Sequence, residues 1–243
     1  MRIFRDPLSI VLVVVIVGAL GIAGILGCEL YARHRATSVL EKVVECVAGD
    51  HASVSLGARP LLLQLMTGNF PDISIETAGN QFREAKGMKL HVQIADLRLP
   101  SNGDAEGTVG SLEAEFSWSN DGIKQTLQDT IPLFGGLMTD VATKPSDGSI
   151  ELHGGLGTIT ARPLLTDSGL ALQVLTVSGF GFTLPPESVQ PPLDAFTSIM
   201  TKSLPAGVHA DSVRLTESGM TARFSARHTS IPVAQANPCF ASL

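Results

Sequence analysis

The stretch GARPLLLQLMTGNFPDISIE, residues 57–76, contains the start and the end of a helix and then a strand. Pro60 suits a first helical position, where its fixed φ and its missing N–H carry no penalty, and Gly68 can take the left-handed conformation that ends a helix. The stretch therefore predicts a helix over residues 61–67. The alternation of apolar and polar residues over 72–76 predicts a strand with one buried face.

The predicted helix over 61–67 is unusual because apolar side chains point in nearly every direction. Its sequence is LLLQLMT, in which Gln64 is the one polar residue among the first six. A surface helix of a globular protein normally carries a single apolar stripe. We therefore expect this helix to be enclosed by the protein or to contact an apolar surface.

Composition and charge limit the possible functions of the chain. The 243 residues are 44% hydrophobic, with a mean hydropathy of +0.26, which is enough apolar material for one main domain with a substantial core. The net charge of -6 and the isoelectric point near 5.5 exclude the basic surface that nucleic-acid binding requires. They also argue against docking on anionic lipid through a polybasic patch, so any lipid contact must be apolar.

The N-terminal run from Pro7 to Cys28 contains no charged residue and is long enough to cross a hydrocarbon core of about 30 Å. It predicts a signal anchor over residues 1–28 that is not cleaved, because no small-x-small site ends the run. Arg2 and Arg5 favour a cytoplasmic N-terminus, although arginines also follow the run. We expect residues 29–243 to form a single domain on the extracytoplasmic side of the cytoplasmic membrane.

The residues Ile25 to Cys28, ILGC, offer an alternative mode of attachment. They resemble a bacterial lipobox, in which the cysteine is acylated after cleavage. Cys28 could therefore make the protein a lipoprotein rather than a protein with a transmembrane anchor. In either case the rest of the chain lies outside the cytoplasmic membrane.

Cys46 and Cys239 are the other two cysteines, and outside the cytoplasm they could form a disulfide. A bridge across so long a loop would stabilise the fold by about 4 to 5 kcal/mol in the chain-entropy model. The alternative is two unpaired thiols, one of them buried as a small hydrophobic group.

The remaining patterns indicate an α+β fold with mostly antiparallel strands. Alternation over 88–94 changes register before Leu97, which predicts a bulge near Ala95 and Asp96. The other expected elements are a helix over 29–48, strands over 52–56, 112–118, 149–160, 170–178 and 180–184, a helix after Asp121, an apolar loop over 133–138, a helix from Pro191, and a hairpin over 207–228.

We find no motif that predicts catalysis, a metal site or a cofactor. The chain lacks the nucleophile elbow, the zinc-protease motif, the P-loop and the dinucleotide fingerprint. Its six histidines are widely separated, without a second ligand at compact spacing. Glu113 and Glu115 share a strand face, but they alternate with core residues and are typical of a solvated face. We therefore expect a protein that is not an enzyme.

These residues resemble the LmeA-type phospholipid-binding family of the actinobacterial cell envelope. The resemblance rests on an N-terminal membrane segment, a helix and a short strand, followed by a G-x-R-P-L-L-x-Q-L-x-x-G-x-F pattern and a D-I-S-I strand. It is carried by Gly57, Arg59, Pro60, Leu61, Leu62, Gln64, Leu65, Gly68, Phe70, Ile73 and Ile75. The hairpin with its Ser218–Gly219 turn agrees in kind.

The resemblance implies phospholipid binding in the envelope, and a body similar to tubular lipid-binding domains, in which a curved antiparallel sheet wraps around helices. We expect acyl chains to lie in an apolar groove. The protein would then act in the periplasm as a lipid carrier or as an accessory to envelope biogenesis. The expected lining or mouth consists of Leu61, Leu62, Leu65, Met66, Phe70, Phe134, Leu137, Phe180, Phe182, Phe196, Ile199 and Met200. For each of these residues the alternative is ordinary core packing.

Two other classes of function compete with lipid binding. In the first, the protein is an envelope scaffold whose hydrophobic patches contact a partner protein of unknown identity. In the second, it is an enzyme acting on a lipid or a glycan, which would require carboxylates or histidines to converge in a cleft.

Overall fold

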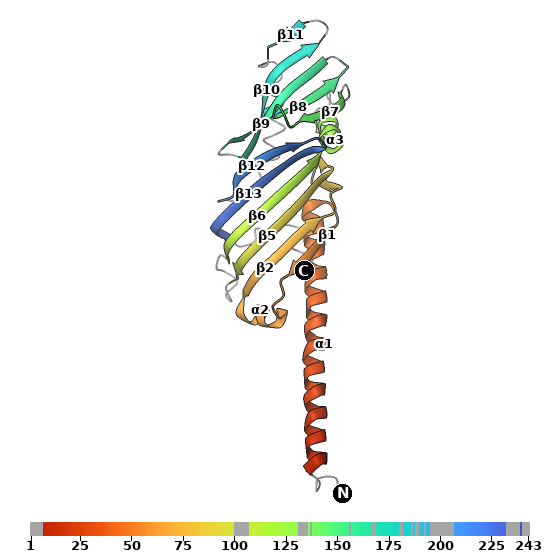
Figure 1. Cartoon of the computed structure of the whole chain (residues 1–243), viewed down its shortest axis with the longest axis vertical. Helices are drawn as coiled ribbons and strands as arrows, with labels where there is room; N and C mark the ends of the chain where they lie inside the picture. The colour runs from red at the N-terminus through yellow and green to blue at the C-terminus, as the bar shows by residue number, and fades with distance from the viewer. Residues whose placement is uncertain are drawn as a thin grey trace.

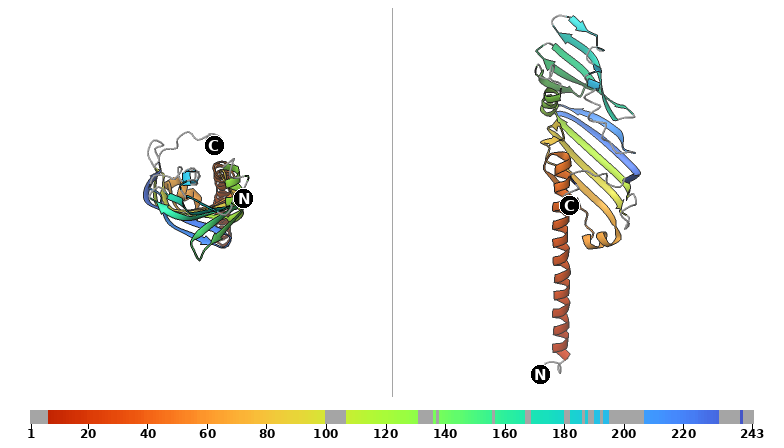
Figure 2. Two further views of the ribbon diagram at one scale, coloured as in Figure 1. Left: turned by 90° about the horizontal axis from the view of Figure 1, so that it is seen from above. Right: turned by 180° about the vertical axis from the view of Figure 1, so that it is seen from behind.

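The computed structural model describes residues 7–99, 107–130, 136, 138–155, 157–166, 169–179, 182–185, 187, 190–191, 193–194, 207–231 and 239. The molecule is elongated, with two antiparallel sheets placed end to end along its long axis and one long helix that projects from the lower end (Figure 1). The sheets form a curved, open layer that is not closed into a barrel, and the long helix lies along one rim of this layer (Figure 2). The expected α+β class with a curved antiparallel sheet is confirmed.

The N-terminal helix α1, Pro7–Ala48, is continuous through the uncharged run and the predicted helix that follows it. Its apolar part is long enough to cross a membrane, and the side chains of that part from Val11 onward are not buried by the protein. The part that follows Cys28 packs on β1, Ala52–Leu56, so α1 both projects from the body and belongs to it.

The larger sheet has six strands in the order β1-β2-β5-β6-β13-β12, with every neighbouring pair antiparallel. Its further strands are β2 (Asn69–Thr77), β5 (Met88–Arg98), β6 (Gly107–Ser119), β12 (His209–Thr216) and β13 (Gly219–Ile231). The C-terminal hairpin thus pairs with a strand from the first half of the chain, which the sequence pattern did not indicate.

The smaller sheet has five strands in the order β11-β10-β9-β8-β7, also antiparallel. They are β7 (Met138–Lys144), β8 (Ser149–Gly154), β9 (Gly157–Thr166), β10 (Gly169–Gly179) and β11 (Phe182–Leu184). The single strand expected over 149–160 was wrong, because Gly154 pairs with Gly157 and the chain reverses there. Met138, which the sequence placed in an apolar loop, begins β7.

Two short helices and a small hairpin complete the described fold. Helix α2, Leu61–Thr67, has the predicted bounds and ends at Gly68, which has φ of 63°. A Cβ on Gly68 would lie 2.4 Å from the Leu99 carbonyl oxygen, so this position requires glycine. Helix α3, Asn120–Thr130, lies between the sheets, beside the hairpin of β3 (Gln81–Phe82) and β4 (Ala85–Lys86).

Two hydrophobic clusters hold the body together. The larger joins both sheets and α3, with Trp118, Ile123, Leu127, Ile150 and Val174 among its buried members. The smaller lies at the lower end, where Leu56, Leu61 and Ile73 are buried against α1. Of the helix expected from Pro191, the structure describes residues 191, 193 and 194 as helical, together with residue 190 before it, and Leu193 is buried in the larger cluster.

A disulfide joins Cys46 in the last turns of α1 to Cys239 near the end of the chain, with a Cα–Cα distance of 5.7 Å. The sequence separation is 193 residues, so the bridge closes a loop that includes nearly the whole body. The third cysteine, Cys28, is exposed and is not in a disulfide.

Candidate functional site: the apolar inner face

The inner face of the six-stranded sheet carries apolar residues in rows that cross the strands. In an antiparallel sheet directly opposite residues point to the same face, so each register pair belongs to one row. The rows on β5, β6 and β13 are Met88–Trp118–Met220, Leu90–Phe116–Ala222, Val92–Ala114–Phe224 and Ile94–Leu112–Ala226. The last two continue onto β2 through Ile75 and Ile73.

Burial along this inner face is uneven. The row through Met88 and Trp118 is buried in the larger cluster. In the middle of the sheet, by contrast, Val92, Leu112 and Ala114 are only partly buried. The inner face therefore keeps accessible apolar surface between the two packed ends of the sheet.

Two residues with positive φ lie in one line with a glycine and a proline across four strands near the lower end. Asp96 on β5 has φ of 53°, and His228 on β13 has φ of 49°. The register places these two residues on either side of Gly110 on β6, and it places Pro71 on β2 opposite Asp96. A Cβ on Gly110 would lie 2.9 Å from Cβ of Asp96, which explains the glycine. We call these four positions the crease.

The crease keeps the apolar face continuous. Ile94 and Leu97 are an odd number of residues apart, yet both pack on the lower cluster. Phe70 and Ile73 on the neighbouring strand show the same spacing and also contact that cluster. Because all the strands change face together, their register is preserved, whereas a bulge in one strand would shift it. The change of face predicted after Ile94 is present, but the bulge expected near Ala95 and Asp96 was wrong, because the pairing of β5 with β6 keeps one register from Ala95 to Arg98.

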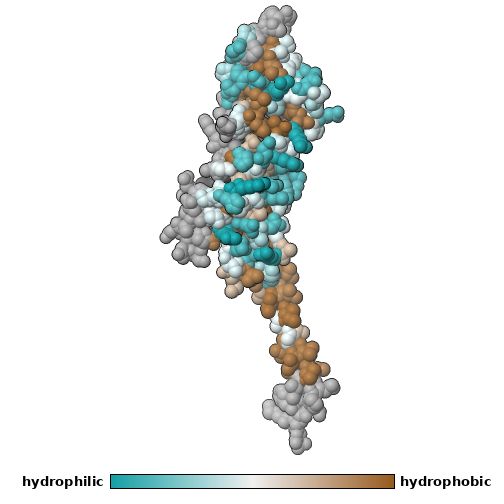
Figure 3. All heavy atoms as spheres, turned by 60° about the vertical axis from the view of Figure 1, so that its left-hand side comes forward, coloured by the Kyte–Doolittle hydropathy of each residue, from teal (hydrophilic) through white to brown (hydrophobic). Residues whose placement is uncertain are grey.

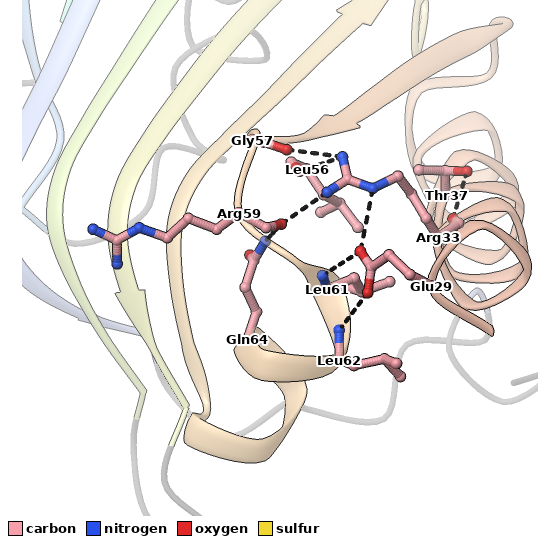
Figure 4. A network of polar contacts seen from close by, with 9 residues as sticks. All are labelled: Glu29, Arg33, Thr37, Leu56, Gly57, Arg59, Leu61, Leu62 and Gln64. Carbon is pink, nitrogen blue, oxygen red and sulfur yellow. Dashed lines mark hydrogen bonds and ion pairs between the residues drawn. The ribbon is translucent and has the colours of Figure 1, made fainter. Parts of the chain in front are cut away.

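Helix α2 closes the lower end of the inner face, and α1 holds it there (Figure 4). The Glu29 carboxylate accepts hydrogen bonds from the N–H groups of Leu61, at 2.5 Å, and Leu62, at 3.1 Å. These N–H groups begin the helix and have no partner within it, and Pro60 supplies no side-chain cap. Glu29 therefore caps α2 from a different element, an arrangement that local sequence patterns do not reveal.

Arg33, one turn after Glu29, fixes the loop before α2. Its guanidinium donates to the carbonyl oxygens of Leu56 at 3.0 Å, Gly57 at 2.8 Å and Arg59 at 2.8 Å (Figure 4). It also lies 3.7 Å from the Glu29 carboxylate. Gln64 of α2 is buried and donates to the same Arg59 carbonyl at 2.7 Å. The position of α2 relative to α1 is thus set by charge-assisted hydrogen bonds.

The structure distributes the expected lining residues among three environments. Leu61 is buried in the lower cluster, and Phe70 is partly buried against it. Leu62, Leu65 and Met66 are exposed on α2. The backbone of Phe182 lies in β11. Phe134, Leu137, Phe180, Phe196, Ile199 and Met200 lie outside the described residues.

Sequence reasoning did not include the central inner-face residues in the candidate site. Val92, Leu112 and Ala114 were identified as members of alternating strands and were therefore assigned to core. The alternation identifies the apolar face, but only the packing of other elements shows which part of that face stays open.

The opposite face of the same sheet is polar. A hollow there is bordered by His91, Glu113 and Glu115 and by Arg223, whose guanidinium lies 2.6 Å from the Glu115 carboxylate. A band of hydrophilic residues crosses the middle of the body in the space-filling view (Figure 3). Burying acyl chains against ionised groups would leave those groups without water, so this hollow does not suit lipid tails.

In the part of the chain that the structure describes, no group of three His, Cys, Asp or Glu side chains is placed to hold a metal ion. Glu113 and Glu115 face the polar hollow, beside Arg223, rather than the apolar face. These two carboxylates therefore lie on the face opposite the apolar rows.

The fold and this face define a class of protein in which an open, curved antiparallel sheet with an apolar inner face follows an N-terminal helix long enough to span a membrane. The chain belongs to the LmeA-like phospholipid-binding family, whose model matches residues 23–225. The family identified from the motif around Leu61 is thereby confirmed.

Mycobacterial relatives support this membership. Uncharacterised proteins of Mycobacterium bovis and Mycobacterium tuberculosis are each 47% identical to this chain over 244 residues. The match covers 100% of this chain and 70% of each relative. No solved structure matches the chain.

Proposed function

We propose that this protein is a non-enzymatic phospholipid-binding protein that holds acyl chains against the inner face of its six-stranded sheet. The observation that carries the proposal is the continuous set of apolar cross-strand rows, partly open at Val92, Leu112 and Ala114. Membership of a phospholipid-binding family supports the same ligand class. Of the expected lining residues, Leu61 and Phe70, which pack in the lower cluster, would extend these rows at the lower end of the sheet.

Continuity of the apolar face matters for energetic reasons. Moving a lipid tail from the bilayer to the protein gains little free energy, because the bilayer already spares each methylene the cost of about 0.8 kcal/mol in water. A polar group along the path would be left without a hydrogen bond and would oppose binding. The crease, which keeps Leu97 on the same face as Ile94, therefore favours a single uninterrupted path.

We further propose that α1 anchors the protein and that residues 29–243 form one extracytoplasmic lipid-binding domain. The Cys46–Cys239 disulfide supports this side of the membrane, because such bonds persist in oxidising compartments. Acylation at Cys28, which is exposed, is the alternative mode of attachment. In the envelope, a body with an open apolar face suits a lipid carrier.

Native mass spectrometry of the full chain, released from detergent and followed by lipid extraction, tests the proposal. We expect phospholipid to co-purify and to be recovered with unchanged mass after incubation. Leu112→Glu should abolish co-purification, whereas Ser111→Glu, the same change on the adjacent outward-facing residue, should not. Protein that is free of lipid and takes none from vesicles would refute the proposal, and chemically altered lipid would refute its non-enzymatic part.

A further inference from the structure

We propose that α2 is a second membrane contact, whose apolar side chains embed in the surface of the bilayer beside the point where α1 leaves it. The inference rests on the proposed anchoring role of α1 and not on lipid carriage. It assigns the exposed side of α2 to the bilayer itself, whereas the proposed function concerns the inner face of the sheet.

The side of α2 that is exposed to solvent consists mainly of apolar side chains, whose contact with water is unfavourable. Leu62, Leu63, Leu65 and Met66 have exposed fractions of 37%, 54%, 56% and 85%. Only Leu61 and Gln64 are buried on this helix. Clustered exposed apolar side chains generally mark a contact site, whereas isolated ones need no explanation.

The depth of α2 relative to the membrane follows from its attachment to Glu29. At 1.5 Å per residue, the uncharged part of α1 from Pro7 to Cys28 is about 33 Å long, close to the thickness of a hydrocarbon core. Glu29 is the first charged residue after this run, so it lies at the boundary of the bilayer. Because Glu29 binds the first N–H groups of α2, that helix lies at the same boundary.

The arrangement of the molecule directs α2 toward the membrane. Helix α2 is at the end of the body from which α1 projects, and no other labelled element lies closer to the projecting part (Figure 1). In the space-filling view, the hydrophobic surface of α1 continues up to the lower end of the body, below the hydrophilic band (Figure 3). A short apolar helix at this level can embed about 5–10 Å into the boundary between headgroups and acyl chains.

The Glu29 and Arg33 contacts make this placement rigid. Arg33 holds the loop before α2 through three carbonyl oxygens, and Glu29 holds the start of the helix. A flexible linker between the anchor and the body would allow the body to tilt freely above the membrane. With α2 fixed to α1, the lower end of the inner face is held next to the lipid surface.

Quenching of tryptophan fluorescence by brominated lipid tests the inference. The full chain carrying Met66→Trp is reconstituted into vesicles of phosphatidylcholine with brominated acyl chains, and wild-type protein, whose single Trp118 is buried, gives the baseline. Leu165→Trp is the matched control, because Leu165 is also an exposed apolar residue, 39% exposed, but lies in the upper sheet. Both sites are exposed, so neither change should perturb folding.

We expect the added emission of Met66→Trp to be blue-shifted and mostly quenched in the vesicles, while that of Leu165→Trp remains unquenched. Equal emission from the two variants would overturn the inference. A second arm adds one equivalent of brominated lipid to the protein in detergent. Quenching of Met66→Trp in this arm would show contact with a bound lipid rather than with the bilayer, and would also overturn it. Absence of co-purifying lipid, by contrast, would refute only the proposed function.

Discussion

The Glu29 carboxylate in α1 accepts a hydrogen bond of 2.5 Å from the backbone N–H of Leu61, the first residue of α2. A second bond to Leu62 completes the cap, so a helix that begins after a proline obtains its N-terminal partners from a residue 32 positions earlier in the chain. This contact links the proposed anchor to the lower end of the apolar inner face.

Glu29→Gln should loosen the start of α2 without unfolding the body. The amide retains one acceptor but loses the charge that strengthens both hydrogen bonds. We expect faster hydrogen exchange at the amides of Leu61 and Leu62, measured by mass spectrometry, with little change in the melting temperature. Glu84→Gln, at an exposed carboxylate between β3 and β4, is the control. Unchanged exchange at both amides would show that the cap does not stabilise the helix.

Leu61→Ala and Leu63→Ala should differ in their effect on stability. Leu61 is 1% exposed in the lower cluster, and truncating such a leucine costs about 2–5 kcal/mol because a cavity remains. Leu63 is 54% exposed, so its truncation should change the free energy of unfolding by less than about 0.5 kcal/mol. Denaturant unfolding of the two variants measures this contrast, and similar values would contradict the described burial.

Replacing Cys46 and Cys239 together by serine should lower the free energy of unfolding by about 4 to 5 kcal/mol in the chain-entropy model. The reason is the length of the closed loop, since the two residues are 193 positions apart. Denaturant unfolding curves of the wild type, with and without reductant, give the same free-energy difference independently. Intact-mass measurement of the native protein should show the bridge, and two free thiols would contradict it.

Asp50 should make the fold sensitive to acid. Burial raises its pKa, but hydrogen bonds from the Asn80 side chain and from the N–H groups of Asn80, Gln81 and Gly79 outweigh burial, so the pKa lies below the ordinary 3.8. A lowered pKa means that the folded state binds the proton more weakly than the unfolded state does. The stabilisation is therefore complete above that ordinary value and is lost as the pH falls through the folded pKa.

Asp50→Asn should remove this pH dependence and cost about 1–3 kcal/mol at neutral pH, because an amide cannot accept all of these hydrogen bonds. Unfolding curves at several pH values, for wild type and variant, measure both effects. If the difference between the two proteins were constant down to the most acidic point, the assignment to Asp50 would fail.

Substitutions at Asp96, in the crease, should change stability according to how readily the new residue adopts a positive φ. Asp96 has φ of 53°, a conformation that glycine adopts freely and that a β-branched residue resists. Asp96→Gly should leave stability nearly unchanged, whereas Asp96→Val should lower it by about 1–2 kcal/mol. Equal melting temperatures for the two variants would indicate that the left-handed conformation is absent.

The sequence alone determined several local elements and the family. Pro60 and Gly68 define the bounds of α2, the uncharged run defines the apolar part of α1, and alternation defines strands such as β5. These features depend on backbone preferences and on the side-chain period, which act between residues close in sequence. The motif around Leu61 was sufficient to identify the family for the same reason, since it is a local pattern.

Only the tertiary structure decided which apolar residues are core and which are exposed. Leu61 and Leu65 belong to one short helix and have the same side chain, yet one is buried and the other is 56% exposed. The difference arises because Glu29 and Arg33, far away in the sequence, fix how α2 lies on the body. Burial is a property of the neighbours that the fold brings together, and a local pattern contains no information about those neighbours.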